Sequence, residues 1–426
     1  MRIPFTLEHE YRLALPADDT RGLSNGQSLL TINTASSADR SLQDPLLPPS
    51  ATAVLSARPT FIWRPRDPFQ YEHARQRSLR HGESEPVQWE RVEVMGPDIE
   101  DKQTVGQLAR MSGNAYAIPG QKNWYDLDGM WNTSFPFGWE DAADGFRGHV
   151  FVAPDNGTVV LSIKGTTLQG PTSKKDKFND NLLFSCCCAR VDFSWVFSTV
   201  CDCYSHSWKC DQSCLNQALV EDSLFYSVGV NLVTNLTALY PTSTIWLVGH
   251  SLGGALASLL GTTFGLPAVA FEAPGERRAA ERLHLPLPPA DPDAPSSSDP
   301  SASHFTSGEG YFGSAPVTHV YHTADPIPQG VCTGFGSPCV AAGYALETRC
   351  HLGRSVVYDT VGKLGWRVDV RYHPIRTAIL DVIEREMEDG WEEDCEGFLR
   401  DVPAARVEAD CVDCYKWEFG DFKKKK

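Results

Sequence analysis

The sequence lacks the long apolar segment that a membrane-spanning helix requires. None of its stretches reaches about 18 uninterrupted apolar residues, and its first residues, MRIPFTLEHEYRL, hold no apolar core of a secretory signal peptide. A surplus of basic residues is also missing, because 38 Lys and Arg stand against 54 Asp and Glu, for a formal net charge of −16. Binding to nucleic acid requires a basic surface, so this composition argues against a nucleic-acid-binding protein.

Paired C-x-x-C motifs with the spacing of a metal site are missing too, although the chain contains 13 cysteines. Most of them gather in two stretches, CCC (Cys186–Cys188) and CDCYSHSWKCDQSC (201–214). Disulfide bonds are favoured for so many cysteines and we expect no bound metal, although His206 in the second stretch leaves zinc as the alternative. Since 13 is an odd number, at least one thiol lacks a partner within the chain.

Three N-x-S/T sequons, at Asn132, Asn156 and Asn235, agree with passage through the secretory pathway, where such asparagines are glycosylated. Disulfides and glycosylation both require entry into the secretory pathway, but the sequence holds no targeting segment that would direct this entry. The conflict disappears if this sequence begins after that segment, and this is the interpretation that we prefer.

Composition divides the chain into a lead-in and a folded domain. Polar residues, Pro and Arg dominate residues 1–85 and predict a weakly ordered lead-in, with short strands at Thr60–Trp63 and Val87–Val94. Residues 86–426 are expected to form the folded domain. Within it, the low-complexity stretch PLPPADPDAPSSSDPSAS (286–303) predicts a disordered surface loop.

Apolar periodicity in the folded domain alternates between the strand pattern and the helix pattern. Strands are predicted at 148–153, 158–163, 243–248, 269–272 and 317–322. Helices are predicted within 98–116 and at 219–241, 252–264 and 375–387. Strands that alternate with helices pair in parallel, so we expect an α/β fold with a mostly parallel sheet and helices on both faces.

The stretch IWLVGHSLGGALASLLG (Ile245–Gly261) places a G-x-S-x-G motif between a predicted strand and a predicted helix. So sharp a turn strains the backbone of the central Ser251, and the lack of side chains at Gly249 and Gly253 leaves room for neighbouring elements. The hydroxyl would project above a helix N-terminus, where N–H groups favour developing negative charge. We interpret Gly249, His250 and Gly253 as the nucleophile elbow around Ser251; the alternative is a glycine-rich turn without chemistry.

A serine nucleophile needs a base, and the base needs an acid that orients it. Hydrolases with this motif have the chain order Ser, acid, His. Asp325 in VYHTADPIP directly follows a predicted strand and is the candidate acid, with a turn role before Pro326 as the alternative. His351 and His373 both follow it, and we favour His373, which lies at the start of the last predicted helix.

An oxyanion hole needs two backbone N–H donors. One donor follows the nucleophile and is Leu252. The other comes from a loop after an earlier strand, and Thr166 fits, since it directly follows the predicted strand in VVLSIKGTTLQG.

The motifs GHSLGGALASLLG, FEAPGE, HTADPIPQGVC, CHLG and YHPI, with the cysteine-rich stretch, resemble the class 3 (fungal-type) lipases, and within them the fungal vacuolar lipases that degrade autophagic bodies. The resemblance covers about Asp98 to Phe422. It implies an α/β-hydrolase fold without a cofactor and the triad Ser251, Asp325 and His373. It also implies hydrolysis of membrane phospholipids and neutral lipids (triacylglycerol) in the vacuole lumen or at the multivesicular-body membrane. Members of that family carry an N-terminal signal anchor, which this sequence lacks.

The cysteine-rich insertion at 168–215 follows the oxyanion strand, and the resemblance implies that it forms a lid over Ser251, which opens on lipid. Its apolar residues are Phe178, Leu182, Leu183, Phe184, Phe193, Trp195 and Phe197. A buried subdomain held by disulfides is the alternative. Two other functions stay open: a soluble carboxylesterase with the same triad, and a non-catalytic protein that binds lipid or metal.

Overall fold

The computed structural model describes residues 55–422, apart from 84, 128–130, 132–133, 141–144, 168–169, 189–199, 222–223, 291–310, 333–338, 340–342 and 409–410. Its centre is a seven-stranded sheet with the order β10-β9-β8-β7-β5-β4-β3. The strands are β3 (Ser134–Phe137), β4 (Gly148–Val152), β5 (Thr158–Ile163), β7 (Thr244–His250), β8 (Ala268–Phe271), β9 (Val317–His322) and β10 (Arg354–Tyr358). The neighbours from β5 to β10 pair in parallel, and β4 and β3 extend the sheet antiparallel. The predicted mostly parallel sheet is therefore confirmed.

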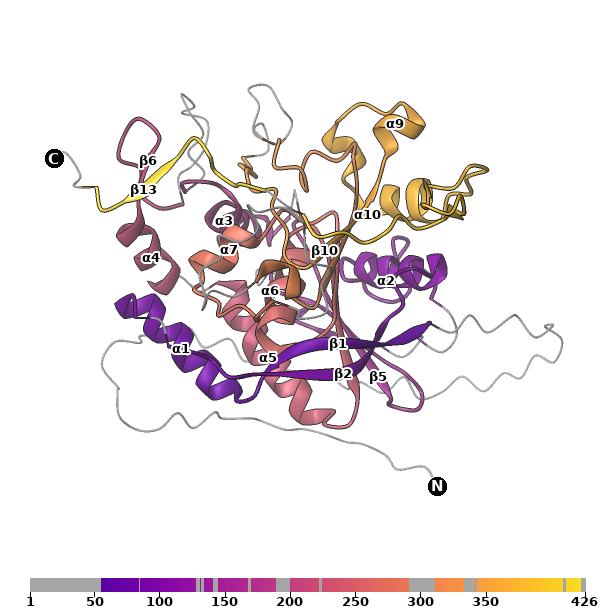
Figure 1. The fold of residues 1–426 in the computed structure, drawn as a ribbon, viewed down its shortest axis with the longest axis horizontal. Helices are drawn as coiled ribbons and strands as arrows, with labels where there is room; N and C mark the ends of the chain where they lie inside the picture. The colour runs from indigo at the N-terminus through magenta and orange to yellow at the C-terminus, as the bar shows by residue number, and fades with distance from the viewer. Residues whose placement is uncertain are drawn as a thin grey trace.

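Helices cover both faces of this sheet (Figure 1). One hydrophobic cluster joins it to α5 (Phe225–Leu239) and α6 (Leu252–Phe264). A second cluster joins it to α2 (Lys102–Asn114) and the π-helical segment η5 (Ala378–Ile383), which continues α10 (Ile375–Thr377). Because each face is covered, the central strand β7 is apolar in both directions: Leu247 belongs to the first cluster, whereas Trp246 and Val248 belong to the second.

Within the predicted lead-in of residues 1–85, the structure describes regular elements from Ala57 onward. An antiparallel pair, β1 (Ala57–Pro65) and β2 (Trp89–Pro97), flanks the helix α1 (Pro68–His81). The helix starts at the N-cap Asp67, whose carboxylate accepts the Phe69 N–H, and ends at Gly82 in the left-handed conformation. The residues that stabilise this helix lie far from it in the sequence, so the local sequence pattern did not predict it.

Contacts with the central sheet and with the chain around Leu283–Pro286 hold this N-terminal unit in place. Arg75 on α1 donates to the Leu283 carbonyl at 3.2 Å, and Tyr71 donates to the Pro286 carbonyl at 3.1 Å. On the strand side, Trp246 of β7 donates through Nε1 to the Met95 carbonyl at 2.8 Å. The remainder of the predicted lead-in, residues 1–54, and most of the predicted loop at 286–303 lie outside the described residues.

Two predicted helices differ from the observed ones. The helix expected at 219–241 is two helices, α4 (Gln212–Glu221) and α5, since Leu224 between them has the extended backbone angles φ −80° and ψ 145°. Pro241 follows the end of α5, as expected for a residue that cannot continue a helix. The last helix, expected to reach residue 387, is helical only from Ile375 to Ile383.

Disulfide bonds tie the cysteine-rich insertion together, and the zinc alternative for its cysteines is wrong. The pairs are Cys186–Cys414, Cys187–Cys210, Cys188–Cys201, Cys203–Cys214, Cys332–Cys339 and Cys350–Cys411. Cys395 is the unpaired thiol and is exposed. In the same region, β6 (Lys209–Asp211) pairs in parallel with β13 (Glu418–Gly420), which Figure 1 shows in yellow beside β6 near the C-terminus.

The remaining elements are short: α3 (Ser173–Phe184), α7 (Arg277–Arg282), η3 (Phe312–Ser314), α9 (Thr360–Leu364), η4 (Val370–Tyr372), β11 (Glu392–Glu393) and β12 (Leu399–Arg400). In the part of the chain that the structure describes, no helix combines the length and the apolar character that crossing a bilayer demands.

Candidate active site

Ser251 lies at the sharp turn from β7 into α6. Its backbone has φ 58° and ψ −130°, a region that residues with a side chain rarely adopt, and 5% of its surface is exposed. A methyl group on Gly249 would lie 2.3 Å from the Gly253 carbonyl oxygen, and one on Gly253 would lie 2.1 Å from the Ile163 carbonyl oxygen. Both glycines are therefore required by the close approach of backbone, which is the steric reason for the motif.

His373 connects Ser251 to Asp325 through its two ring nitrogens. Nε2 lies 2.9 Å from Ser251 Oγ, and Nδ1 lies 2.6 Å from Asp325 Oδ2. Asp325 is fully buried, and its Oδ1 accepts the Ile327 N–H at 2.9 Å. The structure thus brings the three residues predicted from the sequence into one hydrogen-bonded chain, although they are 122 and 48 residues apart.

The sheet explains why these three residues meet. Ser251 follows β7 and Asp325 follows β9, and both strands run parallel, so their carboxyl ends share one edge. His373 enters from the segment before α10, which is tied to the acid loop because Asp369 N–H donates to the Ala324 carbonyl at 3.0 Å. The base is thereby positioned by the loop that carries the acid.

His250, beside the nucleophile, holds the backbone of the base. Its Nε2 lies 2.9 Å from the His373 carbonyl oxygen and its Nδ1 lies 2.9 Å from the Tyr116 hydroxyl. Burial lowers the pKa of His250 to about 3, so its ring is neutral, donating from Nε2 and accepting at Nδ1. Tyr116 was not predicted, because it lies after α2, far in sequence from the motifs, where no local pattern marks it.

The predicted oxyanion loop lies against the nucleophile. Gly165 lies two residues after the end of β5. A methyl group there would lie 3.1 Å from Ser251 Cβ and 2.2 Å from the His250 carbonyl oxygen. The next residue, Thr166, donates from its hydroxyl to the buried Asp180 on α3. Leu252 is the first residue of α6, and its N–H belongs to the free first turn of that helix. Both predicted donors therefore belong to segments that border Ser251.

A buried ion pair stiffens this loop and was not predicted. Asp176 Oδ2 accepts from Lys164 Nζ at 3.0 Å, from the Thr167 N–H at 2.9 Å and from the Thr172 hydroxyl at 2.9 Å. Burial raises the pKa of neighbouring Asp180 to about 8, which keeps this carboxyl mostly protonated near neutral pH. The charged groups beside this loop are therefore Lys164 and Asp176, whereas Asp180 is mostly neutral.

His351, the alternative base, belongs to a different cluster. Its Nδ1 lies 2.8 Å from Glu408 Oε1, and its Nε2 lies 3.2 Å from the Ala273 carbonyl oxygen. With Glu276 and His319 it forms a group whose ligand-type atoms lie within 4.8 Å of one another, as in some metal sites. However, Glu276 Oε1 already accepts from His319 Nε2 at 2.9 Å. Hydrogen bonds and charge pairing account for this cluster without a metal ion.

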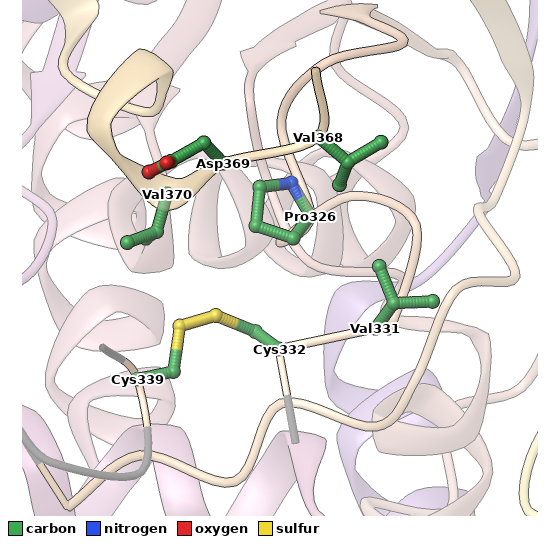
Figure 2. A pocket seen from close by; sticks show the side chains of 7 residues that line it. All are labelled: Pro326, Val331, Cys332, Cys339, Val368, Asp369 and Val370. Carbon is green, nitrogen blue, oxygen red and sulfur yellow. A yellow bond between two sulfur atoms is a disulfide. The ribbon is translucent and has the colours of Figure 1, made fainter. Parts of the chain in front are cut away.

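A cleft of about 260 Å³ lies beside the acid and the base. Its lining consists of Pro326, Val331, Cys332, Cys339, Val368, Asp369 and Val370. Figure 2 shows Pro326 between Val368 and the Cys332–Cys339 disulfide, with the Asp369 carboxylate turned away from Pro326. Pro326 follows the acid, and the Val370 carbonyl accepts the His373 N–H at 3.1 Å, so residues of this mostly apolar cleft adjoin the acid and the base.

Comparisons with known proteins identify the family. The family model described as "Lipase (class 3)" matches residues 162–266. The protein named "Putative lipase ATG15" from Cryptococcus neoformans var. neoformans serotype D (strain B-3501A) is 48% identical over 388 residues, which cover 79% of this chain and 70% of the relative. The chain belongs to the ATG15 family of class 3 lipases. The protein of the same name from Mycosarcoma maydis is 42% identical over 407 residues, covering 84% of this chain and 75% of that one.

Solved fungal lipases are more distant from this ATG15-family chain. The crystal structure of Lip2 lipase from Yarrowia lipolytica shares 17% sequence identity, covers 60% of this chain and 77% of its own, and has a TM-score of 0.31. The lipase II structure from Rhizopus niveus shares 16% identity at a TM-score of 0.28, covering 60% of this chain and 80% of its own.

In this class 3 lipase, three apolar residues of the lid candidate are packed in the core, and Phe178 is half-buried. Leu182, Leu183 and Phe184 on α3 are fully buried, and the disulfides fix the chain that follows. For these residues the structure agrees with the disulfide-held subdomain. Residues Phe193, Trp195 and Phe197 lie outside the described residues.

Two of the three sequons of this class 3 lipase lie on the surface. Asn156 is exposed in the turn between β4 and β5, and Asn235 is exposed on α5. Asn132 lies outside the described residues. The two exposed asparagines remain predicted glycosylation sites.

Proposed function

We propose that this lipase hydrolyses acyl esters with Ser251 as the nucleophile. The observation that carries the proposal is the chain of hydrogen bonds from Ser251 Oγ through His373 to Asp325 Oδ2, at 2.9 Å and 2.6 Å. As Oγ attacks the ester carbonyl carbon, His373 Nε2 takes the hydroxyl proton, and Asp325 stabilises the imidazolium that forms.

The backbone N–H groups of Leu252 and Thr166 would bind the oxyanion of the tetrahedral intermediate. When that intermediate collapses, the ester C–O bond breaks and His373 gives its proton to the departing alcohol. Water, deprotonated by His373, then attacks the acyl–Ser251 ester and releases the fatty acid with regeneration of the serine. Two proton transfers in each half of the cycle leave the enzyme unchanged.

The proposed substrates are the acyl esters of membrane glycerolipids, both phospholipids and triacylglycerol. The mostly apolar cleft beside Asp325 and His373 offers an acyl chain a surface of Pro326, Val331 and Val368. Val331 and Val368 are 53% and 50% exposed, so an apolar rim faces outward beside the site. The ATG15 name of the relatives agrees with a role in autophagy. The role that we propose is the breakdown of autophagic and multivesicular-body vesicles.

We further propose that the protein works in the secretory pathway and the vacuole lumen. Six disulfide bonds support this location, because such bonds persist in oxidising compartments and are rare in the cytosol. A lid role for the cysteine-rich insertion at 168–215 remains part of the proposal.

The test is hydrolysis of phosphatidylserine vesicles by the secreted protein and by its Ser251→Ala variant. We expect fatty acid release from the parent and a loss of roughly 10⁶-fold in kcat for the variant. Ser227→Ala, an exposed serine on α5, is the matched control and should keep full activity. Activity of the parent on p-nitrophenyl butyrate but not on vesicles would favour a soluble carboxylesterase. Full activity of Ser251→Ala would refute the mechanism.

A further inference from the structure

Lys164 lies between the end of β5 and the loop residue Thr166, the proposed oxyanion donor. Its ammonium donates to the Gly165 carbonyl at 2.7 Å and to Asp176 Oδ2 on α3 at 3.0 Å. Only 4% of the Lys164 side chain and none of the Asp176 side chain is exposed. A buried ion pair rarely stabilises a fold more than apolar residues of the same size would, so stability alone does not explain this pair.

The Gly165 carbonyl and the Thr166 N–H belong to one and the same peptide group. Such a group is planar, and in its trans form the C=O and N–H bonds point in opposite directions. A donor that holds the carbonyl in place therefore also sets the direction of the N–H. Lys164 is that donor, so its bond to the Gly165 carbonyl turns the Thr166 N–H away from the buried ion pair.

The other member of the ion pair holds the next peptide group of the loop. The Thr167 N–H donates to Asp176 Oδ2 at 2.9 Å, and the Thr172 hydroxyl donates to the same oxygen at 2.9 Å. Among the residues that the structure describes, the Thr166 N–H between these two anchored groups has no acceptor. This N–H is therefore available for a negatively charged oxygen.

We propose that Lys164 is a positioning residue of the oxyanion hole, which orients and strengthens the Thr166 N–H through the Gly165 carbonyl. The inference rests on the proposed function, because it requires Thr166 to be an oxyanion donor. A carbonyl that accepts from a cation polarises its own peptide group, so the N–H on the other side becomes a better donor, the more so in a buried site of low dielectric. Lys164 itself does not touch the substrate, and its proton stays on the nitrogen throughout the reaction.

The first test is Lys164→Met, which keeps an unbranched side chain but removes its charge and its hydrogen bonds. With the Thr166 N–H misdirected and less polarised, kcat on p-nitrophenyl butyrate should fall by about 10²-fold, the lower end of the loss for a missing oxyanion donor. KM should stay unchanged, because the donor acts in the transition state. Lys102→Met is the matched control: on α2, Lys102 Nζ likewise donates to one backbone carbonyl, that of Arg385 at 2.9 Å, and to one carboxylate, that of Glu386 at 3.0 Å.

Inhibition by an alkyl trifluoromethyl ketone gives a readout that a purely structural role of Lys164 would not move. Ser251 Oγ adds to the ketone carbon, His373 takes the serine proton, and the former carbonyl oxygen becomes an oxyanion in the hole. For Lys164→Met we expect the inhibition constant Ki to rise by about the factor by which kcat/KM falls, whereas Lys102→Met should keep the Ki of the parent. Ki does not depend on the amount of folded enzyme, so a loss of folded protein alone leaves it unchanged.

If Lys164→Met does not fold, because Asp176 is left as an unpaired buried charge, the double variant Lys164→Met, Asp176→Asn takes its place. The Asn oxygen still accepts the Thr167 N–H and no charge is left unpaired, so the loss of kcat and the rise of Ki should be the same. The parental Ki in either folded variant, or an equal rise of Ki in the control, would overturn the proposal. A parent whose hydrolysis survives Ser251→Ala would refute the proposed function instead.

Discussion

Substitution of Gly253 by alanine tests whether the glycine leaves room for the oxyanion loop. The new methyl carbon would lie 2.1 Å from the Ile163 carbonyl oxygen and 2.8 Å from the Gly165 nitrogen. A carbon and a carbonyl oxygen approach no closer than about 3.3 Å, so the end of β5 has to move by about 1.2 Å relative to α6. Both groups are backbone atoms, so no side chain can rotate to relieve the contact.

This displacement separates the N–H of Thr166, the proposed oxyanion donor, from the nucleophile, because Gly165 links β5 to Thr166. A misplacement of about 1 Å at a reacting centre costs on the order of 10²-fold in rate, and we expect this loss in kcat for Gly253→Ala. Overpacking should also lower the free energy of unfolding by about 1–3 kcal/mol. The assay is steady-state hydrolysis of p-nitrophenyl butyrate, together with urea denaturation followed by circular dichroism.

Gly82→Ala is the matched control. Gly82 ends α1 with φ 68°, and a methyl group there would meet no atom within 4 Å. The substitution should cost about 1 kcal/mol of stability through backbone strain, with unchanged kcat. If Gly253→Ala keeps the kcat of the parent while its stability falls, the proposed link between this glycine and the oxyanion loop is wrong.

Two further predictions concern buried charges away from the triad. Arg282→Met should lower the free energy of unfolding by at least about 3 kcal/mol. The reason is that Arg282 Nη1 and Nη2 donate to four backbone carbonyls in the cysteine-rich insertion. A smaller change in urea denaturation would contradict this prediction. Glu408→Gln should destabilise most near pH 5–6, by about 2 kcal/mol. Charged His351 holds the pKa of Glu408 well below its ordinary value against the effect of burial, and Glu408 raises the pKa of His351 in turn. The pair is therefore fully formed above the ordinary Glu pKa and below the ordinary His pKa, and it weakens as pH rises through the folded pKa of His351. Thermal denaturation from pH 4 to 9 measures this, and a difference between parent and variant that grows toward pH 9 would contradict it.

The parts of the molecule that sequence reasoning located are those with a local cause. The strand before Ser251, the helix after it and both glycines follow from steric demands within a few residues of the chain, and the observed α6 has the predicted bounds. Asp325 was identifiable because it directly follows β9, and parallel strands present their ends at one edge. Two histidines, His351 and His373, follow Asp325 in the sequence, and the fold shows that His373 is the one that contacts it.

The parts that were missed depend on distant contacts. The unit of β1, α1 and β2 has a polar composition, and its order comes from bonds such as Trp246 Nε1 to the Met95 carbonyl. Tyr116 forms a hydrogen bond with His250, 134 residues away, and Asp176 accepts one from Lys164, 12 residues away.

The bond between Cys186 and Cys414 encloses a covalent ring of the chain, with 228 residues of sequence separation, and Ser251, Asp325 and His373 all lie inside it. During synthesis this ring can close only after Cys414 has been made, 228 residues after Cys186. A single protease cut anywhere between the two cysteines leaves both fragments attached. Such a nicked molecule would run as one species on a gel without reductant and as two with it, and could keep its three active-site residues together after cleavage.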